Sequence, residues 1–110
     1  MTPGEVRRIA LSLPEAIERE TWEHPTFRVR EKIFATLWEN GQTSVLRSTL
    51  EEQTLLVEDD PLTFQRAPYF GRHGWIQVRI ARAGPTLIDE LLVDAWRLAA
   101  PKRLRETLVR

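Results

Sequence analysis

The chain has 110 residues, with 16 basic and 16 acidic side chains, two histidines and no cysteine. A chain of this length buries roughly 65% of its unfolded surface, which is enough for one hydrophobic core and too little for two. We therefore predict a single domain over residues 1–110, with a basic C-terminal tail at 102–110. The lack of cysteine excludes disulfides, thiolate metal sites and thiol nucleophiles. A net charge of zero argues against coating of nucleic acid by bulk charge but leaves room for a local basic patch.

The hydropathy pattern argues against membrane association. No apolar run approaches the ~20 residues that span a bilayer. Met1 is followed by Pro3, Gly4 and charged residues, where a secretory signal would have an apolar core. We therefore expect a cytoplasmic protein with no membrane partner.

The first predicted element is a short amphipathic helix. Thr2 to Glu5 has the form of a capping box, with Pro3 at the first helical position, and apolar residues follow at helical spacing. Pro14 disfavours helical geometry in the residue before it. The helix should therefore end near Ser12.

Between residues 17 and 48 the apolar side chains alternate with a period of two, which is typical of strands. The predicted strands are Ile17–Trp22, Thr26–Arg30, Lys32–Glu39 and Thr43–Ser48. Strict alternation places Ile33 and Ala35 on one face of the third strand and Phe34 and Thr36 on the other. The segment should form an antiparallel meander.

Two short segments should join these strands. His24–Pro25 is expected to bend the first strand into the second, because proline interrupts a strand. Asn40–Gly41 supplies the residues that a type I′ hairpin turn requires.

The second half of the chain favours helices around one more strand. A helix capped by Ser48 or Thr49 should run through about Val57, 75–80 alternates as a strand, and 85–100 carries the widest apolar stripe of the chain. Helical and strand segments in this order predict an α+β fold, with a single antiparallel β-sheet covered on one face by helices.

A further short helix is predicted after residue 59. Asp60–Pro61 has the form of a cap and a first helical turn, and Leu62 and Phe64 would face inward. Pro68 should end this element.

Basic residues and aromatic rings form the most suggestive set. Four arginines fall on strand positions opposite the predicted core: Arg28, Arg30, Arg47 and Arg79. If Trp38 or Trp75 shares that face, guanidinium groups for phosphates and rings for base stacking would form a nucleic-acid surface. The alternative is an ordinary solvated sheet face, in which Glu18, Glu20 and Glu31 neutralise the arginines through cross-strand pairs.

The distribution of charge along the chain adds to this pattern. Residues 1–60 carry seven basic and twelve acidic side chains, whereas residues 61–110 carry nine and four. The neutral total therefore hides a dipolar chain that could hold an anion locally. Lys32 and Lys102 are the only lysines, and a lysine is a compact point charge suited to a phosphate or carboxylate. Lys102–Arg103 also begins the densest cationic run.

No set of residues predicts catalysis or metal binding. Glu18 and Glu20 are expected on a solvated strand face, and two histidines, His24 and His73, are too few for a metal site of their own. Residues 71–74 resemble a phosphate loop but precede a strand, whereas phosphate loops precede a helix. We therefore expect a protein without enzymatic activity, metal or cofactor.

Several segments of the chain resemble the MmcQ/YjbR family: Trp22–Ala35, Leu46–Arg47, Gly74–Arg79 and Asp94–Leu104. The residues that match the family motif are Trp22, Pro25, Phe27, Lys32, Phe34, Trp75, Pro101 and Lys102. The resemblance implies a compact α+β domain similar to the frataxin-like fold and a DNA-binding protein of the double-wing type. It implies no catalytic residues. The iron binding of frataxins uses an acidic first helix, whereas here Arg7 and Arg8 stand beside Glu5.

Two functions follow from these features. The first is a non-enzymatic DNA-binding domain that contacts phosphates through a local cationic surface of Arg28, Arg30, Lys32, Arg47, Arg79, Lys102 and Arg103. The second is a module for a small anionic ligand or a protein partner, with no nucleic-acid role. Its pocket would lie between Trp22, Pro25, Trp75 and the long helix. Trp96, by contrast, is predicted to pack in the core.

Overall fold

The computed structural model describes residues 1–38, 40 and 42–108. The helices are α1 (Pro3–Ser12), α2 (Leu50–Asp59), α3 (Pro85–Ala99) and α4 (Lys102–Arg105), with short 3-10 helices η2 (Gly71–His73) and η3 (Ile80–Arg82). The strands are β1 (Ile17–Thr21), β2 (His24–Val29), β3 (Lys32–Thr36), β4 (Thr43–Leu46), β5 (Phe64–Arg66) and β6 (Ile76–Arg79). They form one antiparallel sheet in the order β1-β2-β3-β4-β6-β5. The predicted α+β fold with a single antiparallel sheet is confirmed.

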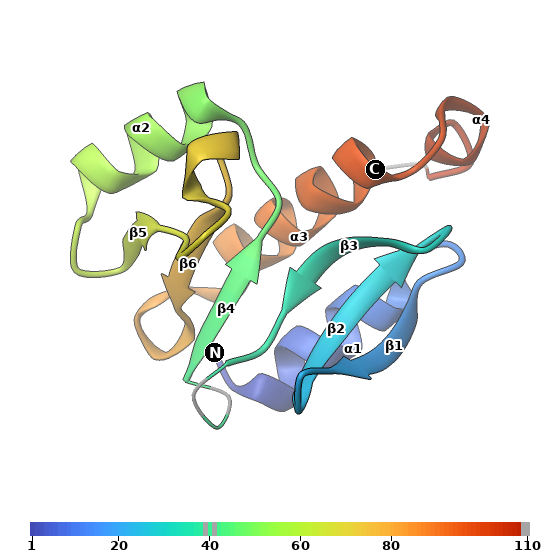
Figure 1. Ribbon diagram of the computed structural model, residues 1–110, viewed down its shortest axis with the longest axis horizontal. Helices are drawn as coiled ribbons and strands as arrows, with labels where there is room; N and C mark the ends of the chain where they lie inside the picture. Colours follow the sequence, from blue (N-terminus) through green and yellow to red (C-terminus); the bar gives the residue numbers. More distant parts are fainter. Residues whose placement is uncertain (39, 41, 109–110) are drawn as a thin grey trace.

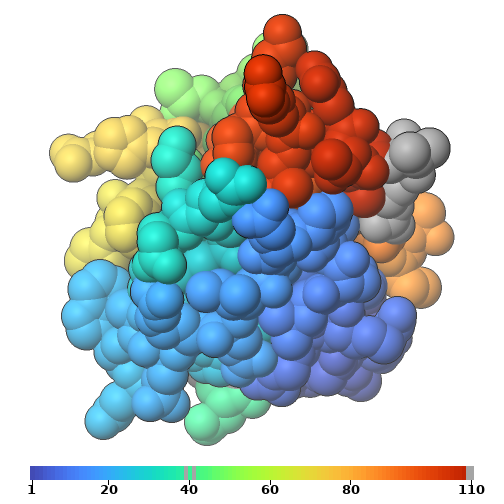
Figure 2. All heavy atoms as spheres, turned by 90° about the vertical axis from the view of Figure 1, so that its right-hand side faces the viewer, coloured from blue at the N-terminus to red at the C-terminus, as the bar shows by residue number. Residues whose placement is uncertain are grey.

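Helices α1 and α3 pack together behind one face of the sheet (Figure 1). The main hydrophobic core lies in this layer, with Phe27, Phe34 and Trp96 fully buried. The indole Nε1 of Trp96 donates to the carbonyl of Pro14 at 3.0 Å, so the largest core side chain is also hydrogen-bonded. Figure 2 shows the first helix and hairpin lying against the C-terminal part of the chain on the surface. In the part of the chain that is described, no helix is long and apolar enough to cross a membrane.

The predicted helix signals act as expected. The Thr2 hydroxyl accepts from the Glu5 amide at 3.2 Å, and the Glu5 carboxylate accepts from the Thr2 amide at 3.1 Å, which completes the capping box. Helix α2 is capped by Thr49, whose hydroxyl accepts from the Glu52 amide at 3.1 Å. The predicted C-terminal tail contains helix α4, and Leu104 anchors it in the main core.

The segment after Asp60 forms a strand, and the helix predicted there was wrong. Asp60 ends α2, and its carboxylate accepts a hydrogen bond from the Thr63 hydroxyl at 2.6 Å, which supports a turn. Phe64 then enters the core and is 2% exposed, whereas Leu62 is 66% exposed. The free edge of β6 decides the outcome, because pairing with it buries Phe64 and satisfies the backbone of β5.

Strict alternation along β3 was also a wrong prediction. The register between β2 and β3 shifts at Phe27 and Arg28, and both Phe34 and Ala35 lie in the helix-side core. A bulge of this kind puts two consecutive residues on one side of a strand. As a result Ile33 and Thr36 share the opposite face of the sheet.

The first hairpin turns at Trp22 and Glu23 instead of at His24–Pro25. Both turn residues have positive φ, 51° and 66°, and Thr21 pairs with His24 across the turn. Pro25 lies inside β2 opposite Glu20. In a two-residue hairpin the pair next to the closing pair exchanges no hydrogen bonds, so proline is tolerated there.

Two other turns can be compared with the predictions. Arg30 and Glu31 also have positive φ, 49° and 68°, and connect β2 to β3, so Arg30 is not on a strand. Trp38 and Thr43 exchange backbone hydrogen bonds of 2.8 and 3.3 Å at the base of the next hairpin. The predicted type I′ turn at Asn40–Gly41 depends on residues 39 and 41, which lie outside the described residues.

Candidate ligand-binding groove

The face of the sheet opposite α1 and α3 carries a groove of about 820 Å³. Its floor is formed by side chains that point to this face from β2, β3, β4 and β6, and its two walls are loop tips. The lining residues are Thr21, Trp22, Thr26, Arg28, Glu31, Lys32, Ile33, Thr36, Trp38, Thr43, Val45, Arg47, Pro68, Tyr69, Phe70, Trp75 and Gln77. We call this set the sheet groove.

Large aromatic rings stand at both rims of the sheet groove. Trp22, at the tip of the first hairpin, is 75% exposed, and Tyr69, in the loop between β5 and β6, is 90% exposed. Both residues have positive φ, which costs a non-glycine residue roughly 1–2 kcal/mol. Rings that remain exposed recover little of this cost through burial in the domain. The exposed rings are therefore candidates for contact with a ligand.

The floor between these rims is also aromatic. Trp75 is 8% exposed, and its ring centroid lies 5.2 Å from that of Phe70. Trp38, another lining residue, packs against His24, which is not in the lining, with 3.9 Å between the two ring centroids. Within the described residues the buried Nε1 of Trp38 and Oγ1 of Thr43 have no hydrogen-bond partner, so two polar groups of this lining are unsatisfied.

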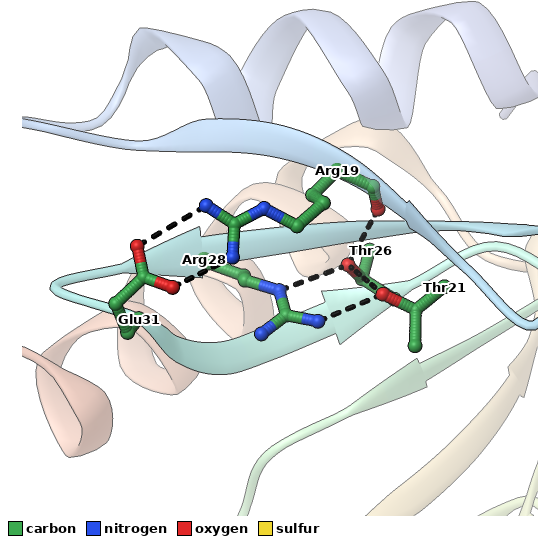
Figure 3. A network of polar contacts seen from close by, with 5 residues as sticks. All are labelled: Arg19, Thr21, Thr26, Arg28 and Glu31. Atoms are coloured by element: carbon green, nitrogen blue, oxygen red, sulfur yellow. Dashed lines mark hydrogen bonds and ion pairs between the residues drawn. The ribbon is translucent and has the colours of Figure 1, made fainter.

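Arg28 reaches the groove from β2 and is held by two hydroxyl groups (Figure 3). Its Nε donates to Oγ1 of Thr26 at 3.3 Å, and its Nη2 donates to Oγ1 of Thr21 at 2.7 Å. The Thr26 hydroxyl in turn donates to the carbonyl of Arg19 at 2.6 Å. Both partners of the Arg28 guanidinium are uncharged, so its positive charge is not neutralised by these contacts.

Arg47 follows β4 and lies over the floor. Its Nε and Nη2 donate to the carbonyl of Ile33 at 3.1 and 2.9 Å, and its guanidinium carbon lies 4.7 Å from the centre of the Trp75 ring. Burial lowers the pKa of Arg47 below its usual value. The group still carries a full charge at neutral pH, because arginine titrates far above it.

The acidic group of the groove is already paired. Glu31 accepts from Arg19 at 2.6 and 3.2 Å, and these hydrogen bonds are the main reason that the pKa of Glu31 lies below its usual value. The charge of Glu31 is therefore offset, while Arg28, Lys32 and Arg47 remain in the lining. The sheet groove is consequently cationic inside a neutral protein.

The loop that carries one aromatic wall is fixed to α2. Gln53 is buried, and its Nε2 donates to the carbonyls of Gly71 and Trp75, both at 2.8 Å. Gly74 has φ of +96°, and a Cβ there would lie 2.5 Å from the backbone of Thr49 and Leu50. Only glycine fits at this point, so the loop approaches the start of α2 closely and is hydrogen-bonded to it through Gln53.

The predicted cations do not all converge. Arg28, Lys32 and Arg47 line the sheet groove together. Arg30 donates to Glu15 at 2.5 and 2.9 Å in the turn between β2 and β3. Arg79 is exposed on β6 beyond the groove lining. The remaining predicted cations, Lys102 and Arg103, are exposed on α4.

Two of the three residues predicted for a ligand pocket lie together in the structure. Trp22 and Trp75 line the sheet groove, whereas Pro25 lies in β2 opposite Glu20. The long helix α3 is on the other face of the sheet, because its amphipathic stripe is used in the core. The glutamates predicted to neutralise the sheet arginines pair elsewhere, Glu18 with Arg7 of α1 at 2.8 Å and Glu31 with Arg19 at 2.6 Å, while Arg30 is neutralised by Glu15.

Sequence reasoning missed the second aromatic wall. Tyr69 and Phe70 were not among the predicted site residues, although two aromatic residues in a surface loop are a signal of binding. Thr21 and Thr26 were also missed, because their role depends on which strands are neighbours. Among the described residues, no group of acidic residues and histidines is arranged to hold a metal ion.

Comparison with known proteins places the chain in a sequence family. A family model described as YjbR matches residues 11–98. The fold is similar to that of Deinococcus radiodurans protein DR2400, a crystal structure of a DUF419 domain, with a TM-score of 0.83 and 18% identity over 96% of this chain and 86% of that chain. No curated protein matches the chain. At this identity the structural likeness shows a shared fold.

Proposed function

The chain belongs to the YjbR family, and we propose that it is a non-enzymatic domain that binds an unpaired nucleotide in the sheet groove. The observation that carries this proposal is the combination of exposed aromatic rims with the Arg28 and Arg47 guanidinium groups, whose hydrogen bonds go to hydroxyl and carbonyl oxygens. A nucleotide combines a flat ring with a phosphate, and the groove offers a matching surface for each part.

The chemistry of the groove suits this ligand class. A base stacked on an aromatic side chain contributes roughly 1–3 kcal/mol and does so with little sequence preference. An arginine forms charge-assisted hydrogen bonds to phosphate oxygens. The volume of about 820 Å³ falls within the range of small-molecule sites, roughly 300–1,000 Å³.

The same geometry favours an unpaired nucleotide over a duplex. Bases in a duplex are stacked on each other, and their edges are read by a helix or ribbon that enters a groove of the DNA. Here the aromatic rings line a recess, and Arg28 and Arg47 belong to its interior. The family resemblance implies DNA binding, and we propose it here only for unpaired nucleotides.

The ligand of the sheet groove could be either a free nucleotide or a nucleotide within an unpaired strand. Three ligands distinguish them: thymidine 5′-monophosphate, a single-stranded oligothymidylate of about ten nucleotides, and a duplex of the same length. Binding can be followed through the indole N–H resonances, because three of the four tryptophans line the groove.

We expect the single strand to bind more tightly than the duplex and to weaken steeply between about 50 and 200 mM salt. Equal affinity for mononucleotide and strand would assign the site to a small anionic ligand. If neither perturbs the indole resonances, the proposal is wrong. The lack of enzymatic activity, the cytoplasmic location and the likeness to frataxin-like folds stay predictions.

A further inference from the structure

The two arginines in the sheet groove are held in different ways. Arg28 donates to two threonine hydroxyls, Thr21 and Thr26, which come from β1 and β2. Arg47 directs two nitrogens to a single carbonyl, that of Ile33, and lies over an aromatic ring. Such different settings suggest different roles.

We infer that Arg28 receives the anionic group of the ligand, whereas Arg47 is a positioning residue that holds the buried Trp75 ring and, through it, the exposed Phe70 ring that a base can contact. This inference rests on the proposed function, because it divides the phosphate and the base of a nucleotide between the two arginines. Arg28 would then determine specificity for the phosphate, which the sequence alone did not assign to any one of the cations.

The polar network fixes Arg28 without neutralising it (Figure 3). Because the Thr26 hydroxyl gives its proton to the carbonyl of Arg19 at 2.6 Å, its lone pairs are left to accept from Arg28. Among the described residues Nη1 of Arg28 makes no hydrogen bond. A guanidinium held in place with a free edge loses little entropy when it binds an oxyanion.

The neighbouring carboxylate does not occupy that edge. Glu31 lines the groove, but both of its oxygens accept from Arg19, at 2.6 and 3.2 Å. Glu31 is therefore hydrogen-bonded to Arg19, and its charge acts on Arg28 as a weaker, longer-range attraction. The guanidinium of Arg28 remains available for an anion from outside the protein.

Arg47 is committed to the floor of the groove. Its guanidinium covers the Trp75 ring at 4.7 Å, and Phe70 packs near the same ring at 5.2 Å. Gln53 holds the carbonyl of Trp75 at 2.8 Å. These contacts fix the Trp75 ring and the Phe70 ring that packs on it, which is 42% exposed. Loss of Arg47 should therefore weaken contact with the base and leave contact with the phosphate intact.

A comparison of thymidine 5′-monophosphate with thymidine tests this division. For the unmodified protein we expect the phosphate to improve affinity by at least about tenfold, since a charged hydrogen bond contributes about 1.5–3 kcal/mol. Arg28→Gln should remove this preference, so that both ligands bind with the affinity of thymidine. Thr26→Val keeps the charge but loses the hydroxyl that orients it, and should reduce the preference partly.

Arg47→Gln should weaken both ligands by the same factor and keep the preference for the phosphate. Arg47→Lys, which keeps the charge but loses the planar contact with Trp75, should behave in the same way if the glutamine variant fails to fold. Arg79→Gln is the matched control, because Arg79 is exposed on the same sheet but outside the groove lining. It should change neither affinity.

The outcomes separate the two proposals. If the unmodified protein binds neither ligand nor an oligothymidylate, the proposed function fails and this inference fails with it. If the protein binds but Arg28→Gln keeps the preference for the phosphate, the inference alone is wrong. It is also wrong if the folded Arg47 variant loses the phosphate preference while its affinity for thymidine is unchanged.

Discussion

The two faces of the sheet differ in how far their side chains are buried. The face under α1 and α3 carries side chains such as Phe27, Phe34 and Ile76, which are fully buried in one continuous core. The groove face carries partly exposed cations, exposed rings and residues with positive φ such as Trp22 and Tyr69. Burial accounts for the apolar side chains of the first face. It does not account for the exposed rings of the second face, which stand at positions with positive φ. We therefore expect changes on the two faces to separate stability from binding.

The largest expected effect lies on the helix-covered face. Trp96→Ala removes a fully buried side chain and its hydrogen bond to the Pro14 carbonyl. The free energy of unfolding should fall by about 3–5 kcal/mol, as measured by urea denaturation, while the protein that stays folded should bind ligand as before. A loss below about 1 kcal/mol would contradict the role of this side chain as the centre of the core.

Gly74→Ala tests the contact that joins the aromatic wall to α2. The new Cβ would lie 2.5 Å from the backbone of Thr49 and Leu50, and φ of +96° is strained for alanine. We expect a loss of at least about 2 kcal/mol in stability together with weaker ligand binding. Gly84→Ala is the control, because no atom lies within 4 Å of a Cβ there. Equal thermal midpoints for the two variants would count against this contact.

Trp22→Gly should weaken binding without lowering stability, the reverse of the effect expected for Trp96→Ala. Glycine relieves the positive φ of 51°, so the free energy of unfolding should stay unchanged or rise by up to about 1 kcal/mol. Affinity for a single strand should fall by about 5- to 150-fold, which corresponds to one lost stacking contact. Glu23→Gly relieves a similar φ of 66° in the same turn without removing a ring, and should bind like the unmodified protein. If Trp22→Gly binds equally well, the rim is not a binding surface.

The smallest effect concerns the ion pairs of the hairpin turns. Hydrogen bonds from Arg30 hold the pKa of Glu15 below its ordinary value of 4.5. A lowered carboxyl pKa adds stability above the unfolded value, and this stability is lost as the pH falls through the folded value. The difference in unfolding midpoint between the unmodified protein and Glu15→Gln should therefore be small near neutral pH and shrink below about pH 4.5. A difference that grows on acidification would contradict this pairing.

Local signals predicted much of the fold. The capping box of α1, the Thr49 cap of α2 and the long apolar stripe of α3 depend on neighbours along the chain, and the structure follows each of them. The period-two pattern of the middle segment predicted its strands, although not the bulge in β3. The same alternation placed Arg28 and Arg47 opposite the core, as observed. The errors occur where a distant strand decides the outcome: the free edge of β6 draws Phe64 into a strand, and the bulge between β2 and β3 places Phe34 and Ala35 on one side.

The sequence by itself determined an α+β fold with a single antiparallel sheet, a neutral total charge, and the placement of Arg28 and Arg47 opposite the core. Only the tertiary structure decided which side chains meet. Trp22 and Tyr69 are far apart in the chain and become the two rims of one groove, because the strand order puts β4 beside β3 and β6 beside β4, and because Gln53 and Gly74 fix the second wall to α2. Pairing of Arg30 with Glu15 and of Glu31 with Arg19 likewise depends on segments that the fold brings together. A binding site made from several loops and strands is a property of long-range contacts, which no local pattern specifies.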